Sequence, residues 1–103
     1  AVLGNTAGGL SGPAIKPIAL KKVFDVYQIT KKHGVPILGQ GGISSAEDAI
    51  EFLLAGATTV GVGTALFFDP LICDKINKGI SNYLETNNYT SVNDLVGDLT
   101  KQQ

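Results

Sequence analysis

Two glycine-containing turns follow short apolar runs in this chain, and their backbone N–H groups could bind an anion. Val35–Gly39 leads into Gly41–Gly42, and Thr58–Val62 leads into Gly63–Thr64. Glycine has no Cβ, so the main chain can approach a ligand closely, and the N–H groups at a helix start favour negative charge. Because strand, glycine and helix start occur twice in succession, the spacing predicts that both turns bind one phosphorylated ligand. Tight turns without a ligand are the alternative.

The other reactive side chains form no catalytic or metal-binding pattern. His33 is the single histidine, and before Gly34 it is expected to interact with the last carbonyls of a helix. Cys73 is the single cysteine, so there is no internal disulfide, and we expect it to be a small residue on a helix. Lys16 is expected at the surface, with contact to an anion as the alternative. Three acidic residues are expected to be solvated on one helix face: Glu47, Asp48 and Glu51.

Hydrophobic spacing predicts the elements that must position the two turns. The residues from Ile18 to Lys32 carry the apolar stripe of an amphipathic helix. Ser44 and Glu47 have the spacing of a capping box at the start of the next helix. The expected order is a loop at 1–17, a helix at 18–33, a strand at 35–40, a helix at 44–55, a strand at 58–63, and helices at 71–85 and 91–101.

Strands that alternate with helices predict an α/β fold with a parallel sheet. Two successive turns that bind a phosphate are typical of one end of a (β/α)8 TIM barrel. A closed barrel needs roughly 250 residues, whereas this chain has 103. We therefore expect one part of an incomplete barrel, whose two strands leave both sheet edges open to further strands.

The composition argues against several classes of partner. Eight lysines, no arginine and a net charge of −1 do not favour nucleic acid. No apolar run approaches the roughly 20 residues of a membrane-spanning helix, so we expect no membrane partner. A single cysteine suits a reducing compartment, and we expect a cytoplasmic protein.

Three motifs, in order, resemble the C-terminal third of class 1 dihydroorotate dehydrogenases. They are G-G-L-S-G-P-A-I-K-P at residues 8–17, V-P-I-L-G-Q-G-G-I-S-S-A-E-D-A-I-E-F-L-L-A-G-A from residue 35, and V-G-V-G-T-A-L from residue 60. The S-G-P-A-I-K-P form is more similar to the class 1B catalytic subunit than to class 1A. The resemblance extends along the chain to about Ile76.

This resemblance implies a cofactor and a set of binding residues. Members of the family are FMN-dependent TIM barrels that oxidise dihydroorotate to orotate in pyrimidine biosynthesis. The chain would then contain the last two βα units of such a barrel, followed by its C-terminal helices. The family's FMN-binding positions fall on Gly12, Gly41, Gly42, Gly63 and Thr64, of which the last four would bind the FMN phosphate.

The resemblance also implies what lies outside this segment. The family's catalytic base, a cysteine in class 1B, lies on an earlier loop, and Cys73 is at the wrong place for it. We therefore expect the 103-residue chain alone to be inactive. Asn5–Thr6 is assigned no substrate role, because the family's Asn-Thr pair lies upstream of the G-G-L-S-G loop. Gln40 stands where relatives often carry methionine, and little effect is expected because the adjoining backbone makes the contact.

The class 1B resemblance implies a partner subunit that contains FAD and an iron–sulfur centre and passes electrons to NAD. We also expect a homo-oligomer. Two alternatives remain at this point. One is a different phosphate-binding barrel enzyme, such as a sugar-phosphate isomerase or synthase, and the other is a non-catalytic chain that only self-associates.

Overall fold

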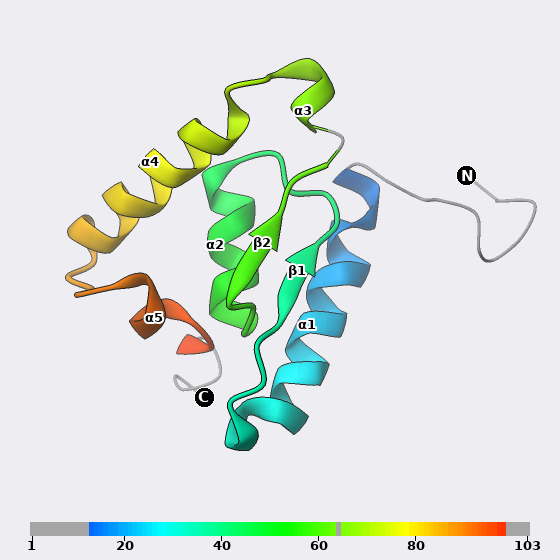
Figure 1. Cartoon of the computed structure of the whole chain (residues 1–103), viewed down its shortest axis with the longest axis vertical. Coiled ribbons are helices and arrows are strands. Elements are labelled where there is room, and N and C mark those ends of the chain that lie inside the picture. Colours follow the sequence, from blue (N-terminus) through cyan, green and yellow to red (C-terminus); the bar gives the residue numbers. More distant parts are fainter. Residues whose placement is uncertain (1–12, 64, 99–103) are drawn as a thin grey trace, which may run out of the picture.

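The fold is a two-stranded parallel sheet with helices packed on one of its faces (Figure 1). The computed structural model describes residues 13–63 and 65–98. The elements in chain order are a 3-10 turn at Pro13–Ile15, α1 (Lys16–Thr30), a second 3-10 turn at Lys31–His33, β1 (Leu38–Gln40), α2 (Ala46–Ala55), β2 (Thr59–Gly61), α3 (Ala65–Phe68), α4 (Ile72–Thr86) and α5 (Val92–Leu95).

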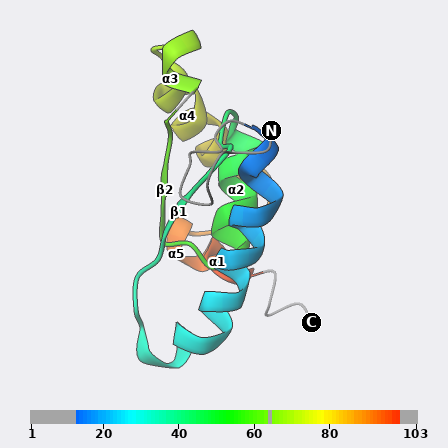
Figure 2. The same ribbon diagram turned by 90° about the vertical axis from the view of Figure 1, so that its right-hand side faces the viewer.

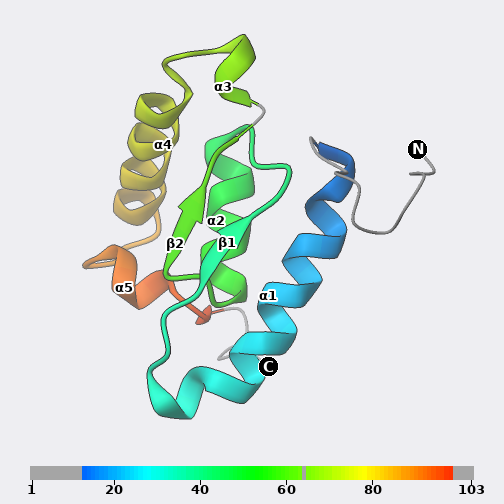
Figure 3. The same ribbon diagram turned by 45° about the vertical axis from the view of Figure 1, so that its right-hand side comes forward.

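The two strands have one covered face and one uncovered face. Leu38 pairs with Thr59 and Gln40 with Gly61, so both strands run in the same direction and end at the same edge. Both α1 and α2 lie on one side of the strands (Figure 2), and α4 flanks α2 on the side away from α1 (Figure 3). On the opposite face Leu38 is 57% exposed. The helices described here therefore shield one side of the sheet only.

Helix α2 is the centre of the hydrophobic core. Ala49 and Phe52 are fully buried, and Leu53 is 3% exposed. Phe52 packs beneath β1, where a Cβ on Gly39 would lie 2.7 Å from its Cδ1 atom. Burying a phenylalanine side chain contributes about 1.5–3 kcal/mol to the free energy of unfolding. The absence of a side chain at Gly39 therefore makes room for one of the larger contributions to the core.

The N-terminal half of the chain differs from the expected boundaries for local reasons. Residues 13–15 form a 3-10 turn and α1 begins at Lys16, so this part of the expected loop is helical. Pro17 fixes φ near the helical value and needs no hydrogen-bond acceptor in a first turn. The strand expected from 35 begins only at Leu38, because Pro36 has no N–H and the Thr58 hydroxyl accepts from the N–H of Ile37 at 2.9 Å.

The C-terminal half also ends differently from the expectation. The helix expected at 91–101 ends at Leu95, and residues 99–101 lie outside the described part of the chain. Gly97 has a φ of 73°, which is the left-handed conformation that ends a helix. Its N–H donates to the carbonyl of Leu53 at 2.8 Å, which joins the C-terminal segment to α2.

Candidate phosphate-binding site at the carboxyl edge of the sheet

The two predicted glycine turns lie at the same edge of the sheet. Gln40 pairs with Gly61 at the carboxyl ends of the parallel strands. Gly41 follows Gln40 directly, and Gly63 comes two residues after Gly61. The structure therefore brings together the two turns that the sequence suggested could share a ligand.

The first turn has a backbone that only glycine adopts easily. Gly41 has a φ of 124° and Gly42 a φ of 75°, where a Cβ is strained. Space is also restricted, because a Cβ on Gly41 would lie 2.7 Å from the Ala19 Cβ and 3.2 Å from the Ile15 Cγ2. The segment that follows the G-G-L-S-G loop thus packs directly against this turn. Gly12 itself lies outside the described residues.

Hydrogen-bond donors are available just after the first turn. Within the described ranges, the N–H groups of Gly42 and Ile43 have no acceptor from the protein. Backbone N–H groups require a partner when water is excluded, and an anion is a suitable one. The turn residues can therefore bind a phosphate through the main chain.

The cap of helix α2 differs from the one that the sequence predicted. Its N-cap is Ser45, whose side chain accepts from the N–H of Asp48 at 3.2 Å. The capping pair is therefore Ser45 with Asp48, not Ser44 with Glu47. Both Glu47 and Asp48 lie in the first helical turn, where their negative charge disfavours an anion. Because of these two carboxylates, the turn that precedes the helix is a more favourable place for an anion than the helix start.

The second turn is open to solvent. A Cβ on Gly63 would meet no heavy atom within 4 Å. The Gly63 carbonyl accepts from the N–H of Leu66 at 3.0 Å, which starts the four-residue helix α3. Thr64 lies outside the described residues. Gly63 thus offers unobstructed main chain at the same edge as the first turn.

An ion-paired network fixes the segments around the first turn. Lys16 Nζ lies 2.6 Å from Asp48 Oδ1 and 3.0 Å from Glu51 Oε1. Asp48 Oδ2 also accepts from the N–H of Ser44 at 3.0 Å and from its hydroxyl at 3.1 Å. Asp48 and Lys16 are only 16% and 24% exposed. The expectation that Asp48 is solvated is therefore wrong, and Lys16 is paired with two carboxylates instead of being a free surface cation.

The ion-paired network lowers the pKa of Asp48 and raises the pKa of Lys16. Burial alone would raise the pKa of Asp48, but the hydrogen bonds from Lys16 and Ser44 outweigh burial and lower it below its usual value. Hydrogen bonds to Asp48 and then to Glu51 raise the pKa of Lys16. Both groups are charged at neutral pH, and together they join the start of α1 to the start of α2.

The remaining candidate residues are not part of the two turns. Cys73 is exposed at the start of α4. His33 is exposed in the 3-10 turn before β1, at the opposite end of that strand. Asn5–Thr6 lies outside the described residues. A search of the described residues finds no cluster of ligands for a metal ion and no helix long and apolar enough to cross a membrane.

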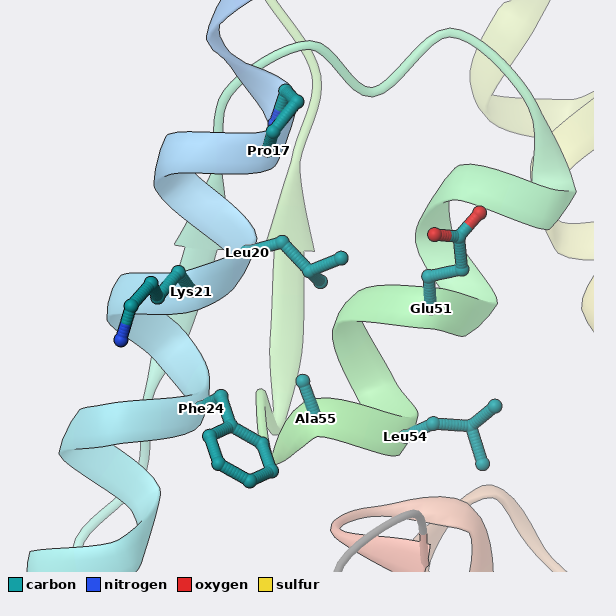
Figure 4. A pocket seen from close by; sticks show the side chains of 7 residues that line it. All are labelled: Pro17, Leu20, Lys21, Phe24, Glu51, Leu54 and Ala55. Carbon is teal, nitrogen blue, oxygen red and sulfur yellow. The ribbon is translucent and has the colours of Figure 1, made fainter.

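A groove of about 680 Å³ lies between α1 and α2 (Figure 4). Leu20 and Phe24 of α1 and Ala55 of α2 form its apolar surface, while the amine of Lys21 points away from it. None of the predicted binding glycines lines this groove. It is therefore separate from the candidate phosphate site.

Two side chains near the site were assigned no binding or capping role from the sequence. Asp48 follows Ser45 by three residues, which is the spacing of a cap, and that signal was assigned one residue too early. Gln40 was noted only as a departure from the methionine of relatives, because its position beside Gly61 depends on the register between β1 and β2.

Comparison with known proteins identifies relatives over nearly the whole chain. A family model described as dihydroorotate dehydrogenase matches residues 1–84. Two proteins named "Dihydroorotate dehydrogenase B (NAD(+)), catalytic subunit" are 50% identical (Phocaeicola vulgatus) and 53% identical (Geotalea uraniireducens) to this chain over 98 residues. Each alignment covers 95% of this chain and 31% of the relative. The chain thus spans about a third of the length of these curated relatives.

A solved structure shares the arrangement of the elements. The crystal structure of DHODH from Eimeria tenella in complex with ferulenol matches with a TM-score of 0.83 and 32% sequence identity. The match covers 93% of this chain and 25% of that chain. Sequence and structure therefore agree on the same group of relatives.

Proposed function

The chain belongs to the dihydroorotate dehydrogenase family, and we propose that it forms the phosphate-binding part of the FMN site in a class 1B enzyme. The parent enzyme would oxidise dihydroorotate to orotate in pyrimidine biosynthesis. The observation that carries this proposal is the placement of two glycine turns side by side at the carboxyl edge of a parallel sheet.

The residues at this edge fit the phosphate of FMN. Gly42 and Ile43 supply N–H groups that have no acceptor within the described ranges. The open space at Gly63 allows a phosphate to approach the main chain of the second turn. Gly41 keeps the first turn in the conformation that aims these donors. We propose that Gly12 and Thr64 also bind FMN, because they occupy the FMN-binding positions of the family's motifs.

The two strands are proposed to be the last two strands of a TIM barrel. Each strand has one neighbour among the described residues, so each has an edge whose N–H and C=O groups can pair with a further strand. The face that α1 and α2 leave uncovered carries Leu38 and would point into the barrel. The fact that the chain spans 31% of its curated relatives is consistent with this assignment.

This chain's residues would hold and orient FMN, which would supply the hydride-accepting chemistry of the reaction. The two turns would fix the phosphate, and the ion-paired network of Lys16 and Asp48 would keep the first turn in place. The base that takes the substrate proton is proposed to lie in the part of the enzyme that precedes this chain. We therefore expect the 103-residue chain alone to show no dihydroorotate oxidation.

Partners follow from the names of the relatives as part of the same proposal. Proteins named as catalytic subunits of an NAD(+) enzyme imply a second subunit that passes electrons to NAD. We propose that this subunit contains FAD and an iron–sulfur centre, that the catalytic subunit itself forms a homo-oligomer, and that the enzyme is cytoplasmic.

The nature of the cofactor tests this proposal. The full-length protein is purified and denatured, and the released flavin is identified by chromatography against FMN, FAD and riboflavin. We expect FMN in a one-to-one ratio with the protein. A colourless protein that also fails to take up added FMN would refute the proposal and would favour another phosphate-binding barrel enzyme.

A further inference from the structure

Gln40 lies at the centre of the candidate site, on the face of the sheet that the helices leave uncovered. It is the last residue of β1 and directly precedes the first glycine turn. Successive side chains of a strand point to opposite faces. Because Gly39 faces Phe52 of α2, Gln40 points to the other face, and it is exposed there.

The side chain of Gln40 extends across the neighbouring strand. A Cβ on Gly61 would clash with Gln40 Nε2 and would lie 2.7 Å from Cγ and 2.9 Å from Cδ. Glycine at position 61 therefore leaves room for the carboxamide to lie over β2. This places the carboxamide between the strand ends that lead into the two turns.

The carboxamide has unused hydrogen-bonding capacity. No partner for its Oε1 or Nε2 atoms is found within residues 13–63 and 65–98. A carboxamide can accept through oxygen and donate twice through nitrogen. A ligand that fills the space over this face would form hydrogen bonds with these carboxamide atoms, because a polar group shielded from water needs a partner.

We propose that the Gln40 carboxamide hydrogen-bonds the hydroxyl groups of the FMN ribityl chain. This inference rests on the proposed function, which places the phosphate against the N–H groups of the turns. The ribityl chain is joined to the phosphate, so it continues from the turns across the uncovered face where Gln40 lies. Its neutral hydroxyls both donate and accept, which matches a carboxamide. Gln40 thus helps to set the affinity for the part of the cofactor that riboflavin and FMN share.

The test compares the binding of FMN and of riboflavin by the full-length apoprotein. Flavin fluorescence is titrated for the wild type, for Gln40→Met and for Gln28→Met. Methionine is similar in length to glutamine, so it can still cover Gly61, but it lacks the carboxamide. Gln28→Met is the matched control, because Gln28 is on α1 and interacts with Lys31. Thermal unfolding of each apoprotein shows whether a change in flavin affinity comes from a loss of folding stability.

We expect Gln40→Met to weaken FMN and riboflavin alike by roughly three- to tenfold, the effect of losing one neutral hydrogen bond. The Gln28→Met variant should bind both flavins like the wild type, and all apoproteins should unfold at similar temperatures. Unchanged affinity for both flavins in Gln40→Met would show that Gln40 only packs over Gly61. A loss for FMN alone would place the contact at the phosphate and overturn the inference. Failure of the wild type to bind FMN would instead refute the proposed function.

Discussion

Replacing Gly63 with alanine is expected to weaken FMN binding while leaving the stability of the full-length protein nearly unchanged. A Cβ at Gly63 would have no heavy atom within 4 Å, and its φ lies outside the left-handed range. The new methyl group therefore meets no clash and no backbone strain. The free energy of unfolding should change by less than about 1 kcal/mol.

The effect on binding follows from where the methyl group would lie. The phosphate is proposed to approach the main chain at Gly63, and a Cβ would occupy part of that space. Loss of one N–H hydrogen bond to an anionic oxygen costs about 1.5–3 kcal/mol. At about 1.4 kcal/mol per factor of ten, the Kd for FMN should rise roughly 10- to 150-fold.

The assay is a fluorescence titration of FMN into the apoprotein, together with chemical unfolding. Gly34→Ala is the control, because a Cβ on Gly34 also meets nothing within 4 Å, whereas its φ is +65°. Gly34 lies before β1, at the opposite end from the turns. The Gly34→Ala variant should lose about 1–2 kcal/mol of stability, because alanine is strained in this left-handed conformation, and it should retain FMN binding. Wild-type affinity in Gly63→Ala would refute the assignment of this turn to the phosphate.

Three further outcomes are expected for the full-length protein. Gly41→Ala should destabilise the protein by about 2–4 kcal/mol in chemical unfolding. The new Cβ would lie 2.7 Å from the Ala19 Cβ, and the φ of +124° is strained for alanine. An unchanged unfolding midpoint would contradict the packing described for this turn. Asp48→Asn should cost about 1–2 kcal/mol at pH 7, because the ion pair with Lys16 is lost. The lowered pKa of Asp48 means that its stabilisation is present above the ordinary value of 3.8 and is lost as the pH falls through the lower folded value. The wild-type and Asp48→Asn stabilities measured across this acid range should therefore converge, and a constant difference would argue against the pair. Cys73→Ser should change stability by less than about 0.5 kcal/mol and leave dihydroorotate oxidation intact, because the thiol is exposed at the start of α4 and belongs to neither turn. Loss of activity would place Cys73 in the site.

The parts of the fold that depend on local chemistry could be predicted from the sequence. Glycine after an apolar run marks a tight turn, so the two turns were identified before any contact was known. Their common edge followed from the rule that strands separated by a helix run parallel. The relation to dihydroorotate dehydrogenases likewise followed from motifs that are contiguous in the chain.

The parts that depend on contacts between distant segments could not be predicted in the same way. Phe52 is fully buried because Gly39, in a different element, leaves room for it. Asp48 is shielded because Lys16, 32 residues earlier, reaches it from α1. Gln40 became a candidate only when the strand register placed it against Gly61. In each case hydrophobic spacing gives no information about which side chain lies opposite.

The most direct test of the proposed function is the anaerobic addition of dihydroorotate to the full-length protein with its flavin bound. We expect the visible absorption of the flavin to bleach as orotate forms in equal amount, and to return when an electron acceptor is added. A flavin that keeps its colour in the presence of excess dihydroorotate would contradict the assignment of this chain to a dihydroorotate-oxidising enzyme.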